Sequence, residues 1–576
     1  MERPHAAGAF LGTHRHAWRR KTVPATGRPT RLAPALLLCL LAAGGALPSC
    51  AGTPAPSPPH TGPSPVQAAA AQGFSQVLGV WEEGFLARDP VKHKDLLYLA
   101  GTHYDMGFQT GYLAAEHTAR MVHDYCNEFL FEMLNIPLES ADLGVLWDWV
   151  RAWLKGSTLA SMHHVPTRFL DEMNGIADGY ARARREGLPG TEREVAFADV
   201  FLLNQAMDVL SGLTYEVLGK SATACNQFAC WGGMTEDGRL FHGRDYQFYN
   251  AGVYQDTALP AVYVPKDETG APAGYPFVTV TAPGFVGLAT ALNAAGISMG
   301  INVVHAWPAR AEDPGLGGLL LIRSIMEEAA TLEDAVRQVR ETERGCPWIY
   351  LIADGKSHEA VVLETILSDP LNPWMQTRYA INRETAHGIL GQPLEADHPE
   401  DGVRVRAADY VMDPAIRGKE LTPPEPFSGY RNNPKYPDNR TWMNFSFPDP
   451  LEERADLVVA TNHFLVPGMR LYQWAPWVAL VWRTYWPASE WRYRAQTELL
   501  LARVESGRAL DWESAWRIAD FLNPATEEGS FLYGPDRTRD VGGHVALMDG
   551  RDLILRALYG RYDDPWVEVS LETFLP

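Results

Sequence analysis

The chain has 576 residues and a formal net charge of −20, from 50 Lys and Arg against 70 Asp and Glu. This balance argues against a nucleic-acid binder, because phosphate neutralisation needs a dense basic face and the body of the chain has no basic run. Hydrophobic residues make up 46% of the chain and charged residues 21%, so it can bury a large core and is not globally disordered. The six cysteines are too few and too scattered for a disulfide scaffold or a paired zinc site. They are Cys39, Cys50, Cys126, Cys225, Cys230 and Cys346.

Residues 1–50 are predicted to be an export signal. Basic residues precede an apolar run over 32–47, which is short for a membrane span. The run ends in Leu-Pro-Ser before Cys50, which resembles a bacterial lipobox, where the cysteine becomes the lipidated first residue of the mature protein. An ordinary secretory signal cut nearby is the alternative. Both interpretations place the folded body outside the cytoplasm, in the periplasm or cell envelope.

Three further segments follow. Residues 51–73 are rich in proline and lack apolar periodicity, which predicts a flexible spacer between membrane and folded body. A mainly helical N-terminal segment is expected over 74–224, and a strand-rich segment over 225–576. In the helical segment, Gly107 and Gly111 lie four residues apart, a spacing that lets another backbone approach closely.

In the segment after residue 224, predicted strands alternate with helices. One helix is expected over 319–330, and the next begins at a Thr331 cap with Asp334 three residues on. Strands interleaved with helix pairs indicate an α/β fold of stacked layers. The predicted strands are 226–234, 240–248, 262–264, 277–281, 297–304, 349–353, 360–364 and 457–461.

A hairpin is predicted at the Asp-Gly pair 237–238, between two apolar runs. With an even number of loop residues, Cys225 lies opposite position 248 or 250. Arg244 then shares the face of Cys225, and Asp245 and Gln247 take the other face. A guanidinium beside a thiol lowers its pKa from about 8.5. An odd loop or a bulge would reverse this assignment.

A lone cysteine in a strand is more often a small core residue than a nucleophile. Here Cys225 opens a strand and is followed by Trp-Gly, the Asp-Gly turn and Gly-Arg-Asp. This combination resembles the acyl-coenzyme A:6-aminopenicillanic acid acyltransferase family of cysteine N-terminal nucleophile (Ntn) hydrolases. Choloylglycine hydrolases and acid ceramidase are more distantly similar. Further stretches that resemble the family, in the same order, are 101–111, 290–302, 461–464 and 489–493.

The resemblance implies a four-layer αββα Ntn-hydrolase sandwich and a self-processing enzyme. The chain breaks its own Ala224–Cys225 peptide bond, which frees an α-amine with a pKa of about 7.7–8.0. That amine takes the thiol proton, and the thiolate attacks a linear amide to form an acyl-enzyme. Water or an acceptor amine then resolves the acyl-enzyme.

Four further residues receive roles from the resemblance. Asn302 and Asn462 hold the tetrahedral oxyanion or orient the amine, and Arg244 and Arg492 support the cysteine face. Without the family, hydrogen bonding at strand ends accounts for both asparagines. The implied partner is a small-molecule N-acyl substrate, with no cofactor, no metal and membrane contact only through a lipid anchor. His163, His164, His463 and His544 show no metal-ligand spacing such as His-Glu-x-x-His.

The chain departs from the family at two places. Relatives usually carry an aspartate where this chain has Gln247, so either Asp245 substitutes from a neighbouring position or Gln247 orients the amine by uncharged hydrogen bonds. Ala224 stands where a glycine is common. Self-cleavage is nevertheless expected.

Other functions compete with the thiol amidase. Gly-Ile-Ser298-Met-Gly fits a serine-hydrolase elbow, but that elbow needs a following helix and the next residues favour a strand. An inactive lipoprotein that binds acylated ligands and a phospholipase B-like esterase are the remaining alternatives. The aromatic segment 472–485 either lines an acyl pocket or packs in the core. The sequence leaves open the substrate, the choice between hydrolysis and transfer, and the oligomeric state.

Overall fold

The computed structural model describes residues 63–128, 144–217, 225–247, 252–304, 315–369, 401–417, 450–473 apart from Glu453, and 485–575, with isolated positions between them. These residues belong to one compact unit, Thr61–Pro576. Cys50 and Ala224 lie outside the described residues, as do the whole of the predicted signal and the peptide bond predicted to break.

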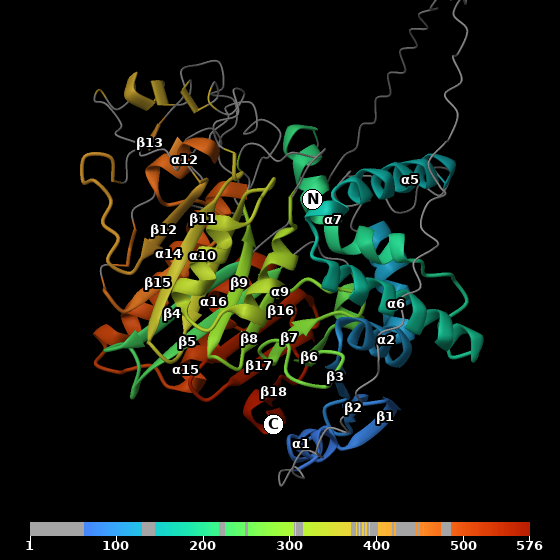
Figure 1. Cartoon of the computed structure of the whole chain (residues 1–576). Helices are drawn as coiled ribbons and strands as arrows, with labels where there is room; N and C mark the ends of the chain where they lie inside the picture. The colour runs from blue at the N-terminus through green and yellow to red at the C-terminus, as the bar shows by residue number, and fades with distance from the viewer. Residues whose placement is uncertain are drawn as a thin grey trace, which may run out of the picture. The chain divides into compact units, whose positions relative to one another are not determined.

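Two sheets form the centre of the fold (Figure 1). Within each sheet all neighbouring strands pair antiparallel except β3 and β6, which pair parallel. The ten-stranded sheet contains, in spatial order, β1 (Gln76–Trp81), β2 (Gly84–Asp89), β3 (Lys94–Gly101), β6 (Leu259–Pro265), β7 (Phe277–Thr281), β8 (Thr290–Asn293), β9 (Ile297–Val303), β10 (Trp348–Asp354), β11 (Glu359–Thr365) and β12 (Val403–Ala407). The six-stranded sheet contains β15 (Leu457–Ala460), β4 (Asn226–Gly232), β5 (Gly238–Gln247), β16 (Asp540–Asp549), β17 (Ile554–Arg561) and β18 (Val567–Ser570).

The two sheets face each other and helices cover their outer faces. Strand β10 contacts β4 and β5, and β11 contacts β15, so the sheets form the inner layers. On the ten-stranded sheet lie α9 (Gly318–Glu328) and α10 (Leu332–Glu341); on the six-stranded sheet lie α14 (Tyr485–Glu505) and α15 (Trp512–Ala519). The predicted four-layer αββα sandwich is therefore confirmed.

Other elements complete the described chain, and no helix within it combines the length and apolar character needed to cross a bilayer. A short ribbon pairs β13 (Glu420–Leu421) with β14 (Phe445–Ser446). The remaining helices are α1 (Pro65–Ala71), α2 (His103–Leu113), α3 (Ala115–Ala119), π-helix η1 (Arg120–Tyr125), α5 (Gly144–Ala160), 3-10 helix η3 (Met162–His164), α6 (Thr167–Arg185), α7 (Phe197–Val217), α8 (Gly252–Thr257), α12 (Pro467–Gln473), α16 (Glu527–Tyr533) and 3-10 helix η4 (Leu571–Phe574).

The structure differs from the prediction in two segments, 51–73 and 74–224. Helix α1 lies inside the segment 51–73 that was predicted to be a flexible spacer, because Ser64 and Gln67 form a capping box around Pro65. The segment 74–224 is helical only from α2 onward. It opens instead with β1, β2 and β3, whose strands extend the ten-stranded sheet. Each strand predicted after residue 224 overlaps an observed one, and Thr331 caps α10 through the backbone N–H of Asp334.

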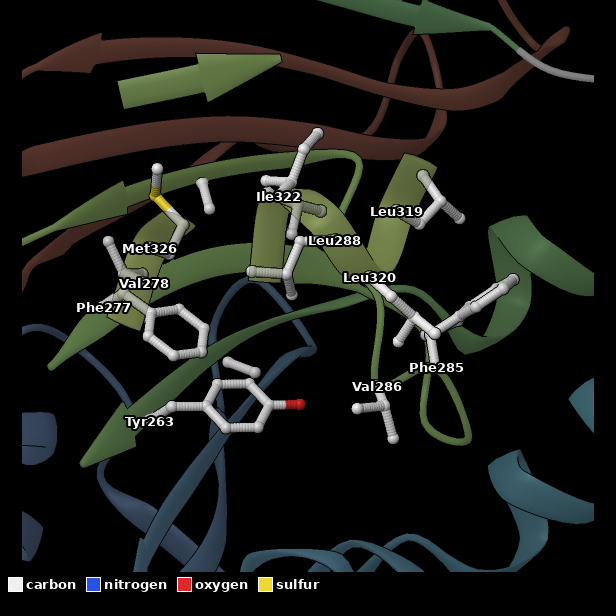
Figure 2. Packing of buried hydrophobic residues seen from close by; sticks show 14 of the residues in the cluster. Tyr263, Phe277, Val278, Phe285, Val286, Leu288, Leu319, Leu320, Ile322 and Met326 are labelled. Carbon is white, nitrogen blue, oxygen red and sulfur yellow. The ribbon is translucent and has the colours of Figure 1, made fainter. Parts of the chain in front are cut away.

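The core between α9 and the ten-stranded sheet is continuous and apolar. Figure 2 shows Leu319, Ile322 and Met326 of α9 among side chains of β6, β7 and the loop that follows. All residues of β6, β7, β9 and β10 are buried, since both faces of this part of the sheet are covered. Their sequences are accordingly mostly apolar, and Asp354 at the end of β10 is the one charged residue in these four strands.

Glycines allow α2 and α6 to cross at very short range. A Cβ added to Gly107 or Gly111 would lie 2.0 Å from a carbonyl oxygen of α6. Conversely, a Cβ on Gly175 would lie 2.2 Å, and one on Gly179 2.1 Å, from a carbonyl oxygen of α2. The close approach predicted from the spacing of Gly107 and Gly111 is confirmed.

We expect Gly111→Ala to destabilise the fold by about 3 kcal/mol or more, because neither backbone at the crossing can yield to a methyl group. Gly156→Ala in α5 is the matched control, since nothing lies within 4 Å of its added Cβ. That substitution is expected to be neutral or stabilising by up to about 1 kcal/mol. Thermal unfolding of both variants checks this, and equal melting temperatures would contradict the packing argument.

Candidate active site

Cys225 lies at the start of β4, in the six-stranded sheet between β15 and β5. The pairs Asn226–Asp245 and Gln227–Arg244 place Cys225 beside Tyr246, not opposite position 248 or 250 as predicted. Residues 233–237, an odd number, join the two strands, and the register shifts by one residue between Cys230 and Gly232. The odd loop and the shift offset each other near Cys225, so Arg244 shares the face of Cys225 as predicted. The thiol is fully buried and its Sγ lies 3.5 Å from the Gln247 carbonyl oxygen.

Asn302 and Asn462 join the two sheets at this point. Asn302, in β9 of the ten-stranded sheet, donates through Nδ2 to the Thr461 carbonyl at 2.9 Å. Asn462, just after β15 of the six-stranded sheet, donates through Nδ2 to the Val303 carbonyl at 2.7 Å. Each asparagine therefore bonds the backbone of the opposite sheet, next to its partner asparagine.

An arginine binds the side-chain carbonyl of each asparagine. Arg244 donates to Asn302 Oδ1, and Gln227 adds a second bond to the same oxygen at 2.9 Å. Arg492 donates to Asn462 Oδ1 at 3.0 Å. A guanidinium has no acceptor, so it fixes each Oδ1 toward the arginine and each Nδ2 toward the opposite sheet.

Arg492 also bonds directly to Cys225 and to the strand that follows it. Its Nη1 donates to the main-chain carbonyl of Cys225 at 2.9 Å and to Asn226 Oδ1 at 3.0 Å. Among the described residues, the hydrogen bonds of Arg244 go to Asn302 and to backbone carbonyls, and none goes to the Cys225 thiol. The structure thus brings Cys225, Asn302, Asn462 and both arginines together, with Arg492 rather than Arg244 bonded to Cys225.

Asp245 and Gln247 form a separate polar group on the other face of the strand. Gln247 Nε2 donates to Asp245 Oδ2 at 3.2 Å and to the Tyr562 hydroxyl oxygen at 2.5 Å, and its Oε1 accepts from Tyr533. Burial, together with the nearby carboxylate of Asp520, raises the pKa of Asp245 well above its usual value. Burial also raises the pKa of Asp520 to about 7.

The serine of the Gly-x-Ser-x-Gly motif lies in a strand, as its context indicated. Ser298 in β9 is 1% exposed, and its hydroxyl lies 2.9 Å from His242 Nδ1. Burial, with Arg244 nearby, lowers the pKa of His242 to about 3, and its Nε2 lies 3.3 Å from Gln227 Oε1. This serine and histidine join the two sheets, and Ser298 lies within a strand where the serine-hydrolase motif needs a turn into a helix.

Gln227 is a site residue that the sequence analysis did not single out. Two residues after Cys225 it shares the cysteine face, so strand alternation was the available signal. The structure also contains a cavity of about 300 Å³ lined by Tyr410, Arg417, Glu452 and Arg454 among others, and no predicted site residue lines it. In the part of the chain that the structure describes, no three His, Cys, Asp or Glu side chains could hold a metal together.

Residues 235–381 match the acyl-coenzyme A:6-aminopenicillanic acid acyl-transferase family. Over 501 residues the chain is 30% identical to an uncharacterized protein of Archaeoglobus fulgidus, covering 85% of this chain and 67% of that protein. The chain belongs to this family. Membership places it among the Ntn-type hydrolases and acyltransferases that act on amide bonds.

Two solved structures are similar at a TM-score of 0.30. One is the Caenorhabditis elegans ortholog of N-acylethanolamine-hydrolyzing acid amidase, 12% identical, covering 59% of this chain and 95% of that one. The other is a mutant form of conjugated bile acid hydrolase from Clostridium perfringens, 10% identical, covering 60% of this chain and 92% of that one.

The raised pKa of Asp520 predicts stability that is lost as pH rises. The unfolded carboxyl has a pKa of about 3.9, so between that value and about 7 the folded state holds a proton that the unfolded state has released. This contribution is complete below about pH 4 and is lost by about pH 7. Asp520→Asn should therefore flatten the fall in the free energy of unfolding between about pH 5 and 8.

Urea unfolding at several pH values measures that slope. The exposed Asp563 provides the control, since Asp563→Asn should leave the slope of the wild type unchanged. Parallel curves for wild type and Asp520→Asn would show that this carboxyl does not carry the linkage.

Proposed function

We propose that the chain is a self-processing cysteine Ntn-hydrolase that cleaves or transfers acyl groups at linear amide bonds through a thioester on Cys225. One observation carries the proposal: Asn302 and Asn462 converge from opposite sheets beside the strand that Cys225 opens, and Arg492 bonds both Asn462 and Cys225. Family membership supports amide chemistry at such a centre.

Processing would convert a buried thiol into a nucleophile with its own base. Hydrolysis of the Ala224–Cys225 bond consumes one water, which leaves a carboxylate on Ala224 and an α-amine on Cys225. That amine has a pKa of about 8, whereas the amide nitrogen before cleavage has no such basicity. The amine takes the S–H proton, and the thiolate forms a C–S bond with the substrate carbonyl carbon. The C–N bond then breaks, the proton leaves on the amine product, and water or an acceptor amine releases the acyl group.

The asparagines supply the donors for the oxyanion. A side-chain amide carries two N–H groups. Asn302 and Asn462 each use one on a backbone carbonyl of the opposite sheet, which leaves a second N–H for the tetrahedral oxygen. Because Arg244 and Arg492 fix the Oδ1 atoms, the donors are oriented before substrate arrives, and this kind of preorganisation lowers the barrier.

The uncharged side chain of Gln247 affects the protonation of the Cys225 α-amine, which is the proposed base. A carboxylate beside the new amine would favour its ammonium form. Gln247 carries no charge and bonds Asp245, whose pKa is raised well above its usual value by burial. We propose that this group orients the strand by hydrogen bonds and leaves the amine free to act as a base near neutral pH.

We also propose that the protein is exported and anchored through a lipid on Cys50, and that its substrate is a small N-acyl amide. The apolar run before Cys50 and the proline-rich residues after it support this placement.

Intact-mass analysis of the purified protein tests the processing step. The wild type should yield, under denaturing conditions, a fragment with the mass of residues 225–576, and Cys225→Ala should remain whole. Cys230→Ala is the matched control, because Cys230 is equally buried in the same strand but points to the opposite face. Its chain should be processed like the wild type.

Alkylation with iodoacetamide should label Cys225 only in the processed protein. An unprocessed wild type whose amidase activity equals that of Cys225→Ala would contradict the proposed function. That outcome would favour the acyl-ligand-binding lipoprotein instead.

Replacing Arg492 tests the link between nucleophile and asparagine. A lysine cannot reach Cys225, Asn226 and Asn462 at once, so Arg492→Lys should lower kcat on N-acyl amides by about 100-fold or more. The exposed Arg494 on the same helix is the control, and Arg494→Lys should keep kcat within about twofold. Equal activity of the two variants would contradict the assignment.

A further inference from the structure

Ser489, near the start of α14, contacts the segment that carries Asn462. It is fully buried and lies three residues before Arg492, so the two side chains are neighbours on one helix face. The Asn462 backbone N–H donates to Ser489 Oγ at 2.8 Å. The same oxygen lies 3.0 Å from Thr461 Oγ1 and 2.8 Å from His463 Nδ1.

Helix α14 therefore holds Asn462 at two points. Ser489 binds its main-chain N–H, and Arg492 binds its side-chain carbonyl at 3.0 Å. A third contact runs from the Thr461 hydroxyl to the Ser489 carbonyl oxygen at 3.1 Å. With both ends fixed, the Asn462 side chain has little freedom to move its Nδ2 away from the junction of the sheets.

Only a hydroxyl suits this position chemically. Ser489 Oγ accepts the Asn462 N–H while its own hydrogen points to Thr461 Oγ1 or His463 Nδ1. Burial, with Arg470 and Arg492 nearby, lowers the pKa of His463 well below its usual value, so the ring is neutral. An alanine here would leave the N–H of Asn462 buried and unpaired, which is costly in a dry site.

We propose that Ser489 is a positioning residue for the reaction at Cys225, acting through Asn462 by fixing its backbone while Arg492 fixes its side chain. This inference rests on the proposed function. Ser489 itself is no nucleophile, because its oxygen is fully buried and engaged with Asn462, Thr461 and His463.

The test uses protein expressed from the full chain and allowed to process itself. The substrate is chosen from a panel of N-acyl amides of 7-amino-4-methylcoumarin as the one that the wild type turns over with the highest kcat/KM. Ser489→Ala should lower kcat about 10- to 100-fold with KM within about threefold, because the donor is misplaced mainly in the transition state. Iodoacetamide labelling of Cys225 should keep its wild-type rate within about twofold. Thr497→Ala is the matched control, since among the described residues the buried hydroxyl of Thr497 bonds the Tyr493 carbonyl of its own helix and no other group.

A double-variant cycle separates positioning from a general structural role. If Ser489 acts through Asn462, then Ser489→Ala combined with Asn462→Ala should be no slower than Asn462→Ala alone. Ser489→Thr keeps the hydroxyl and should turn over faster than the alanine variant. If Ser489→Ala does not fold, the kcat of Ser489→Thr is compared with that of the wild type. A loss of kcat of more than about tenfold in Ser489→Thr would then oppose the proposal.

Additive losses in the cycle, or a Ser489→Ala variant with kcat within about twofold of wild type, would overturn this inference and leave the proposed function standing. Wild-type protein with no more turnover than Cys225→Ala would overturn both.

Discussion

A guanidinium can donate hydrogen bonds but cannot accept them. This property orients the polar side chains at the junction between the two sheets. Arg244 and Arg492 each bind an asparagine carbonyl, which forces the amide of Asn302 and of Asn462 toward the backbone of the opposite sheet. Both arginines are fully buried, where such bonds are strong and an unpaired partner is costly. The geometry beside Cys225 therefore depends on these two charges keeping their acceptors.

The ten-stranded sheet contains strands that precede Cys225 in the sequence and strands that follow it. Strands β1, β2 and β3 precede the cysteine, and their parallel junction with β6 joins them to strands that follow it. A buried ion pair reinforces the connection, because Arg323 of α9 binds Glu172 of α6 at 2.8 Å and Glu327 of its own helix at 2.6 Å. Such charges are tolerated in the interior since each is paired.

The two faces of the cysteine strand perform different tasks. One face points between the sheets and carries Arg244 and Gln227, which both donate to Asn302 Oδ1. The other points to the helical layer, where Asp245 and Gln247 bond each other and the hydroxyls of two tyrosines. Burial raises the pKa of Asp245 and of Asp520 behind the strand, while the guanidinium of Arg244 lies on the face of Cys225.

The sequence by itself determined the layered α/β fold, a hairpin that contains the Asp-Gly pair, and the close helix crossing at Gly107 and Gly111. These follow from strand alternation, turn chemistry and residue size, which are local properties of the chain. Tertiary structure decided that β1–β3 join the large sheet, that Arg492 rather than Arg244 bonds Cys225, and that Ser489 holds Asn462. Those contacts span up to 267 positions in sequence, and no local pattern records which distant donor meets which acceptor.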